Sequence, residues 1–176
     1  MKSLHLAFFL LFLKAKTAKK FELCELYYKL RVLGLDGYHG YEAKELVCLA
    51  QFPADANTQY YAVDHRDVPY YGIFQLSGHE WCNNGRHTTK NKCKTSCNNF
   101  LDDDIRDDAQ CLKKALIEHG LKYWKHYRKN CTYAALRLYS FHCSYYFEND
   151  NWYKKLLSKG KGRRNSLTVH IHFPRN

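Results

Sequence analysis

The chain has 176 residues, eight cysteines and a formal net charge of +11 at pH 7. This length fits one domain with an appended segment. After the first 18 residues no apolar run is long enough to cross a bilayer, so we expect a protein without a transmembrane segment.

The N-terminal segment, residues 1–18, has the layout of a secretory signal peptide. A lysine precedes an apolar run of ten residues from Leu4 to Leu13, and small residues follow. A membrane span needs about 20 apolar residues, so this run is too short for one. We expect cleavage after Ala18, with Ala15 as the alternative. The sequence therefore predicts a secreted, extracellular protein.

Two helices are expected next, at residues 22–33 and 42–52. The first places leucines at a helical spacing and ends at Gly34, and the second ends at Pro53. Aromatic and β-branched runs at 59–63 and 70–75 flank the polar residues 64–67, which favours a β-hairpin.

A loop rich in Asn, Gly, Thr and Lys is expected over residues 79–99. The clearest helix follows at 105–119 and ends at Gly120, and a short helix is expected at 121–128. Helices at both ends with a small sheet between them indicate an α+β, mostly helical domain with a small antiparallel β-hairpin subdomain.

All eight cysteines lie after the first 18 residues. An even number in a small exported chain is typical of four disulfides rather than of metal sites, although counting does not choose the pairing. They are Cys24, Cys48, Cys82, Cys93, Cys97, Cys111, Cys131 and Cys143.

An acidic tract lies at the start of the predicted helix 105–119. Five of the seventeen acidic residues lie between Asp102 and Asp108, and Arg106 is the one cation among them. A hard divalent cation bound by oxygen atoms would make this arrangement favourable. The alternative is a solvated acidic first turn that complements the helix dipole. The tract is not an EF-hand, because the required glycine and closing glutamate are absent.

Residues 19–143 resemble the C-type lysozyme and α-lactalbumin family in the order of the cysteines and in several motifs. The motifs are Lys-Lys-Phe-Glu-Leu-Cys-Glu-Leu at 19–26, Gly-Leu-Asp-Gly-Tyr at 34–38, Tyr-Gly-Ile-Phe-Gln at 71–75, Trp-Cys-Asn at 81–83, the tract 99–108 followed by Cys-Leu-Lys-Lys, and Lys-Tyr-Trp at 122–124. The resemblance implies a lysozyme-like fold with disulfides Cys24–Cys143, Cys48–Cys131, Cys82–Cys97 and Cys93–Cys111.

The resemblance also implies a Ca²⁺ site in the acidic tract. The implied ligands are the side chains of Asp102, Asp107 and Asp108 and the main-chain carbonyls of Asn99 and Asp104. Three carboxylates with neutral oxygens suit the coordination of Ca²⁺.

The two catalytic carboxylates of the family are replaced at the positions that the resemblance implies. Pro53 stands where the general acid follows the second cysteine by five residues, and Tyr70 stands where the second carboxylate precedes the 71–75 motif. Lysozyme is itself the type case of this two-carboxylate chemistry. Proline does not titrate, and a tyrosine has a pKa near about 10. Neither Asp55 nor Asp67 is a substitute, since Asp67 would lie about 10 Å away along the strand and on its opposite face. We therefore expect that this protein is not an enzyme.

In this family, the loss of both carboxylates with a full calcium loop is the α-lactalbumin combination. The resemblance then implies a regulatory subunit of a β-1,4-galactosyltransferase, which makes lactose. The implied docking positions match in part: they hold Gln51-Phe52, Ser140-Phe141 and Asn130.

Two alternatives remain open. The first is a non-hydrolytic saccharide-binding protein, for which Trp81 and Trp124 match aromatic residues of the sugar cleft, although both also fit a simple core. The second is a weak muramidase. We expect a monomer in each case.

The tail, residues 144–176, has no counterpart in the family. It holds seven Lys and Arg, two acidic residues and several aromatic residues. This mixture is typical of segments that bind membranes, polyanions or nucleic acid, or of a solvated extension. Export argues against nucleic acid as a partner. His170 and His172 suggest a metal site only weakly. Asn130 begins a glycosylation sequon.

Overall fold

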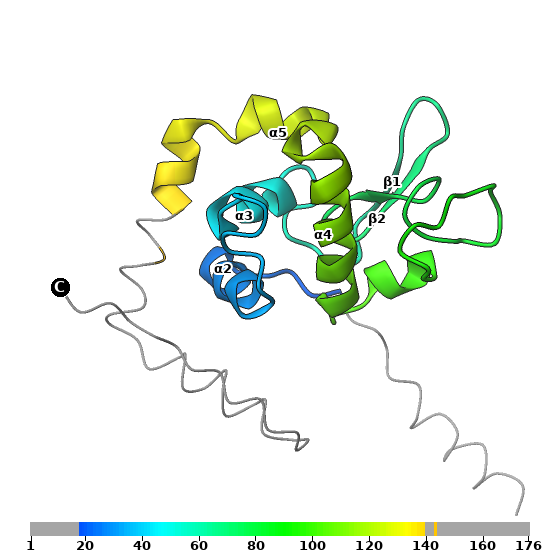
Figure 1. The fold of residues 1–176 in the computed structure, drawn as a ribbon, viewed down its shortest axis with the longest axis horizontal. Coiled ribbons are helices and arrows are strands. Elements are labelled where there is room, and N and C mark those ends of the chain that lie inside the picture. The colour runs from blue at the N-terminus through cyan, green and yellow to red at the C-terminus, as the bar shows by residue number, and fades with distance from the viewer. Residues whose placement is uncertain (1–17, 140–142, 144–176) are drawn as a thin grey trace, which may run out of the picture.

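The computed structural model describes residues 18–139 and Cys143. The predicted signal peptide, the tail and Phe141 lie outside the described residues. The described elements, drawn in Figure 1, are α2 (Leu23–Val32), α3 (Ala43–Gln51), β1 (Tyr61–Val63), β2 (Pro69–Tyr71), β3 (Leu76–Ser77), the 3-10 helix η1 (Cys97–Leu101), α4 (Arg106–His119), the 3-10 helix η2 (Leu121–Tyr123) and α5 (Lys125–Asn130).

The first two predicted helices are confirmed with slightly shorter bounds. After α2, Gly34 adopts a φ of 68°, a left-handed conformation that glycine takes without strain. At the start of α3, the side chains of Glu42 and Glu45 form a capping box with each other's backbone. One face of α2 is buried, through Leu26 and Leu30, which is why its leucines recur at a helical spacing, whereas most residues of α3 are buried.

The predicted hairpin is confirmed, but the sheet has a third strand. Its order is β1-β2-β3 and all pairs are antiparallel, with Tyr61 opposite Tyr71 and Tyr70 opposite Ser77. The prediction of one strand over 70–75 was wrong, because Gly72 turns the chain at a φ of 72° directly after β2. The chain then returns as β3, whose two residues are too few to show a period in the sequence.

Helix α4 runs through the middle of the molecule (Figure 1). The helices α2, α3 and α5 lie on one side of it, and the sheet and the long loops lie on the other. Its buried face, with Ala109, Leu112, Ala115 and Leu116, joins one continuous hydrophobic core. Burial of this face stabilises the fold in proportion to its apolar area, at about 25 cal/mol per Å².

Four disulfides close the fold with the implied pairing. The longest joins Cys24 to Cys143 across 119 positions. On the chain-entropy account, a crosslink over that length stabilises the folded state by about 4–5 kcal/mol.

The predicted helix at 121–128 is interrupted. The 3-10 helix η2 ends at Tyr123, Trp124 is extended with φ −86° and ψ 105°, and α5 begins at Lys125. The break aims the Trp124 indole at the interior, where its Nε1 donates to the Phe74 carbonyl at 2.8 Å. Within the described part of the chain, no helix has the length and apolar character of a membrane span.

Candidate functional site

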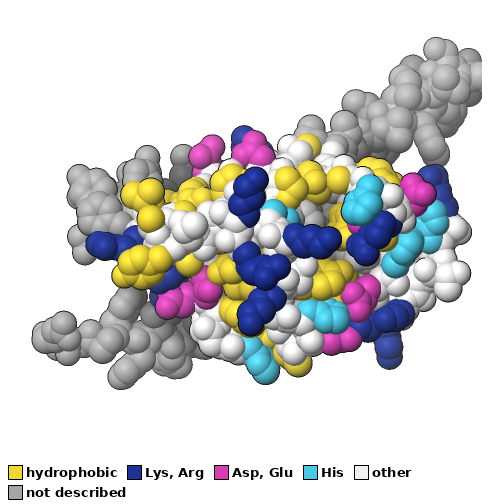
Figure 2. Space-filling view, turned by 90° about the horizontal axis from the view of Figure 1, so that it is seen from above, with side chains coloured by type: hydrophobic (Ala, Val, Ile, Leu, Met, Phe, Trp, Pro, Cys, Tyr) yellow, Lys and Arg dark blue, Asp and Glu magenta, His cyan; other side chains and the backbone are white. Residues whose placement is uncertain are grey.

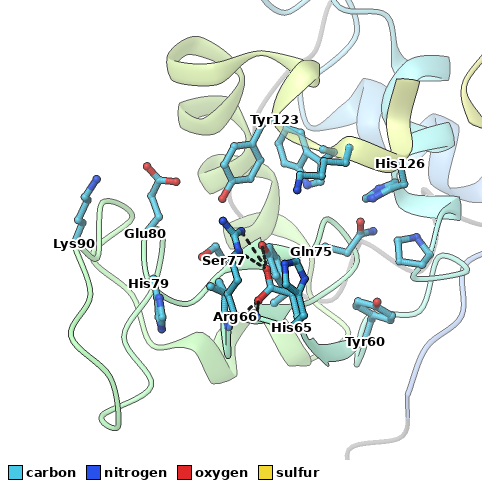
Figure 3. A pocket seen from close by; sticks show the side chains of 16 residues that line it. Tyr60, His65, Arg66, Gln75, Ser77, His79, Glu80, Lys90, Tyr123 and His126 are labelled. Carbon is cyan, nitrogen blue, oxygen red and sulfur yellow. Dashed lines mark hydrogen bonds and ion pairs between the residues drawn. The ribbon is translucent and has the colours of Figure 1, made fainter. Parts of the chain in front are cut away.

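A cleft lies between the sheet and the segment that holds η2 and α5. It has a volume of about 590 Å³. Its lining residues come from four parts of the chain, namely the segment after α3, the sheet with its turns, the loop after β3 and the segment from η2 to the start of α5 (Figure 3). They are Pro53, Tyr60, Asp64, His65, Arg66, Val68, Tyr70, Gln75, Ser77, His79, Glu80, Lys90, Tyr123, Trp124, Lys125 and His126. Cavities of this size hold small ligands in other proteins.

Both positions implied for the catalytic carboxylates line this cleft, as Pro53 and Tyr70. The Tyr70 hydroxyl donates to Asp64 Oδ2 at 3.3 Å, and the Arg66 guanidinium donates to the same oxygen at 3.1 Å. The position of the second catalytic carboxylate is therefore occupied by Tyr70. Its hydroxyl belongs to a hydrogen-bonded cluster with Asp64 and Arg66.

Asp64 is the cleft residue that sequence reasoning missed. It starts the hairpin turn, and its Oδ1 accepts hydrogen bonds from the backbone of Arg66 at 2.8 Å and of Val68 at 3.0 Å. Desolvation opposes its ionisation, but these backbone bonds and the Arg66 guanidinium outweigh it and lower the pKa of Asp64 to about 2. Aspartate at the first turn position is a known signal for such bonds, and this signal could have located it.

The titration of Tyr70 and Glu80, two further acidic groups in the cleft, is also set by their surroundings. Burial and the Asp64 charge raise the pKa of Tyr70, so its phenol is neutral at pH 7. Burial works to raise the pKa of Glu80, but hydrogen bonds from Lys92 and His119 prevail and lower it. The two carboxylates that line the cleft are therefore both anions. A retaining glycosidase needs a protonated carboxyl beside an ionised one.

Two polar side chains of the cleft have buried atoms without a hydrogen-bond partner. Gln75 is 3% exposed, and its Nε2 donates to the carbonyls of Ile73 and Leu49 at 3.2 and 3.4 Å, whereas its Oε1 has no partner. His126 Nε2 is likewise unpartnered, and burial lowers the pKa of its imidazole, which favours the neutral ring. Figure 3 shows both groups pointing toward the same space. Such atoms lose free energy unless a ligand or water bonds to them.

The aromatic residues expected at a saccharide or partner surface separate into three groups. Trp124 lines the cleft. Trp81 is fully buried and packs edge-on against His119 and Tyr123, with centroids 5.7 and 6.4 Å apart, so it is a core residue and offers no open face for a sugar. Phe52 is 36% exposed at the end of α3 and is not part of the cleft.

The acidic tract lies at the opposite end of α4 from the cleft segment η2–α5. It is anchored by two buried apolar residues, Phe100 and Ile105. Asp108, in the first turn of α4, is 1% exposed, and its Oδ2 has no hydrogen-bond partner. Its Oδ1 lies only 2.7 Å from where a Cβ on Gly72 would stand, so the turn after β2 packs directly on this carboxylate.

The structure separates the roles of the neighbouring acidic side chains. The Asp103 carboxylate bonds to residues outside the tract: it accepts hydrogen bonds from the Lys19 backbone N–H at 3.1 Å and from Thr58 Oγ1 at 3.2 Å. Asp104 pairs with Arg106, so the one nearby cation is already engaged. The Asp102 carboxylate accepts from the Asp104 backbone at 2.9 Å.

The electrostatics of the tract favour a bound cation. Burial, and then the charge of Asp107, raise the pKa of Asp108 well above its usual value. Burial also raises the pKa of Asp107, with further contributions from Asp102 and Asp104. A buried carboxylate without a partner is costly, and a divalent cation bound by oxygen atoms would remove that cost. The donor set, which is all oxygen, suits Ca²⁺.

The acidic tract is not the tightest cluster of metal-binding residue types in the described part of the chain. That cluster is Glu80, Glu118 and His119, whose ligand atoms lie within 4.8 Å of one another. Lys92 Nζ already bridges the two glutamates, at 2.7 Å from Glu80, and His119 Nε2 lies 3.0 Å from Glu80 Oε1. This cluster is an ion-pair network that ties the loop after β3 to the end of α4.

Asn130, the sequon residue, ends α5 and is partly buried. Its Nδ2 donates to the His126 carbonyl at 3.1 Å, and the next residue is bridged to Cys48. Glycosylation there stays a prediction.

Comparisons with known proteins agree with this architecture. Milk isozyme lysozyme C of Canis lupus familiaris is 37% identical over 128 residues, which cover 72% of this chain and 99% of the relative. Sperm acrosome-associated protein 5 of Mus musculus is 37% identical over 139 residues, covering 77% of this chain and 86% of the relative. The crystal structure of lysozyme from Equus asinus superposes with a TM-score of 0.68 at 33% identity, covering 71% of this chain and 98% of that one. Residues 19–143 match the sequence profile of a single family, and the chain therefore belongs to the C-type lysozyme/alpha-lactalbumin family.

Proposed function

We propose that this protein is an exported, calcium-binding member of the family that binds saccharides in its cleft and does not cleave them. The observation that carries the proposal is the cleft of about 590 Å³, whose lining includes Gln75 with a buried Oε1 that has no hydrogen-bond partner. A sugar hydroxyl is a donor of the right kind. Three partly exposed tyrosines in the lining, Tyr60, Tyr70 and Tyr123, supply apolar faces for sugar rings.

The absence of hydrolysis follows from the chemistry of the lining. Pro53 offers no proton, and the neutral phenol of Tyr70 is a weak nucleophile because its pKa is raised. Asp64 has the charge of a second carboxylate, but its pKa of about 2 leaves it unable to act as the acid. Proton transfer alone contributes about 10²–10⁴-fold to catalysis, so its loss leaves little muramidase activity.

Calcium binding is the second part of the proposal. The buried carboxylate of Asp108 supports it, since Arg106 is paired with Asp104 and no side-chain cation partners Asp108 among the described residues. Asp102, Asp107 and Asp108 would hold the ion with their side chains, and Asn99 and Asp104 with their carbonyls. Bound calcium would offset two of the negative charges in this part of the chain, next to the turn at Gly72.

Regulation of a β-1,4-galactosyltransferase is a second candidate function. Sequence reasoning placed it first. One observation favours it: Phe52, at one of the implied docking positions, is exposed at the end of α3 and available to a partner. A lactose-synthase assay with added galactosyltransferase tests it, and stimulation of lactose formation would move this candidate to first place.

Export rests on the apolar run of residues 4–13 and on the four disulfides, which persist in oxidising compartments. Mass spectrometry of the material in the medium of expressing cells would give the cleavage site.

Calorimetric titration with chitohexaose tests saccharide binding. We expect binding by the full chain and at least a tenfold loss for Gln75→Met, which keeps the volume and removes the acceptor. Gln110→Met, at an exposed position of α4, is the matched control and should bind normally. Because Gln75 also donates to two carbonyls, thermal melting must show that the variant is folded. A folded Gln75→Met protein with unchanged affinity would contradict the proposed site.

A further inference from the structure

The charges that line the cleft are not balanced. Its two carboxylates both have ion-pair partners within the protein: Asp64 pairs with Arg66 at 3.1 Å, and Glu80 pairs at 2.7 Å with Lys92, which it shares with Glu118. Two further lysines of the lining, Lys90 and Lys125, have no acidic partner among the described residues. The lining therefore presents two lysines without an acidic partner, and no carboxylate without a cationic partner, among the described residues.

The basic side chains of the lining are spread along the cleft rather than gathered at one point, and the two unpaired lysines lie in different parts of it. Figure 3 shows Lys90 and His79 at one end of the view, His65 and Arg66 near the middle, and His126 at the other end. Lys125 adjoins His126 at the start of α5 and is exposed, as is Lys90. A ligand that fills the cleft would meet Lys90 in one part of it and Lys125 in another.

The positive character continues beyond the cleft over α5. Residues 121–130 contain no Asp or Glu. They contain four Lys and Arg side chains, namely Lys122, Lys125, Arg128 and Lys129. Figure 2, seen from the side on which α5 lies in Figure 1, shows Lys and Arg across the middle of this face with His beside them. A saccharide longer than the cleft would therefore contact further positively charged side chains where it extends beyond the cleft.

We propose that the saccharide bound in this cleft is acidic, with sulfate or carboxylate groups on its sugar rings. Lys90 and Lys125 bind these groups from the two ends, while Gln75 and the aromatic lining hold the rings between them. A neutral saccharide would leave both lysines without a role in binding. This inference rests on the proposed saccharide-binding function and names the class of saccharide.

Titration of the full chain, with calcium, tests the inference. The probes are a heparin hexasaccharide, which has sulfate groups, a hyaluronan hexasaccharide, which has carboxylates alone, and neutral chitohexaose. We expect at least one acidic probe to bind tenfold or more tightly than chitohexaose at low salt. The difference should shrink as salt is raised, because the Debye length falls to about 8 Å at 0.15 M ionic strength.

Variants assign the effect to the cleft. Lys90→Gln with Lys125→Gln should lower the affinity for the acidic probe to that for chitohexaose, and the variant should fold normally because both side chains are exposed and neither is an ion-pair partner. Arg86→Gln with Lys94→Gln removes the same charge at exposed positions that do not line the cleft, and should keep the preference.

Each outcome decides the matter. Chitohexaose binding as tight as that of both acidic probes overturns the inference and leaves the proposed function in place. A preference that survives in the Lys90 and Lys125 double variant overturns the cleft assignment, because the charge responsible then lies elsewhere. If no saccharide binds at all, the proposed function itself has failed.

Discussion

The substitution Asp108→Asn tests the calcium loop. In the native protein, calcium that binds the folded state alone stabilises it by RT ln(1 + [Ca²⁺]/Kd). If the dissociation constant is about 1 µM, as in calcium sensor proteins, 1 mM calcium gives about 4 kcal/mol. For a domain of this size, that corresponds to a rise in Tm of about 10–20 °C over the chelated protein.

The order of stability of the native protein and Asp108→Asn should depend on whether calcium is present. Without calcium, Asp108→Asn replaces a buried carboxylate, whose Oδ2 has no partner, with a neutral amide. The chelated variant should therefore be at least as stable as the chelated native protein, because burial of an unpaired charge is costly. With calcium, the variant lacks one ligand and should melt well below the native protein.

Differential scanning calorimetry in 1 mM calcium and in excess chelator gives the four melting temperatures. The matched control is Asp103→Asn, which makes the same charge change on a side chain that bonds to Lys19 and Thr58 outside the loop. It should keep the calcium-dependent rise. An Asp108→Asn protein with the full rise, or a native protein with none, would refute the reasoning.

Two further changes test the turn after β2 and the lost carboxylates. Gly72→Ala should destabilise the fold by about 2–4 kcal/mol in urea unfolding, because alanine is strained at a positive φ and its Cβ would collide with the Phe100 carbonyl. A loss below about 0.5 kcal/mol would show that the turn relaxes easily. The double variant Pro53→Glu/Tyr70→Asp should gain measurable lysis of bacterial cell walls over either single variant, since both carboxyls return to one cleft. A native protein that already lyses at the rate of the double variant contradicts the assignment of these positions.

Most of the fold was predictable from local signals. Helices α2, α3 and α4 have apolar residues at a helical spacing and a glycine or proline at their ends, and these signals act within one or two turns. The third strand was not predictable, since two residues have no period. The break at Trp124 was missed as well, because its cause is a hydrogen bond to the Phe74 carbonyl, 50 positions away.

The cleft was less predictable than the fold. Resemblance located Pro53 and Tyr70, but not the carboxylate beside Tyr70. The Asp64 carboxylate reaches the Tyr70 hydroxyl because the hairpin turn folds back. Distance along an extended strand pointed only to Asp67. Trp81 shows the opposite error: an aromatic residue in a family motif has the same sequence signal whether it is open to a sugar or, as here, fully buried.

A single co-sedimentation experiment tests the central claim most directly. Calcium-loaded protein is incubated with insoluble peptidoglycan, the protein in the pellet is measured, and the new reducing ends in the same tube are counted beside lysozyme from Equus asinus. The account predicts protein in the pellet, with reducing ends no higher than in buffer. Reducing ends released at a rate close to that of the lysozyme would contradict it.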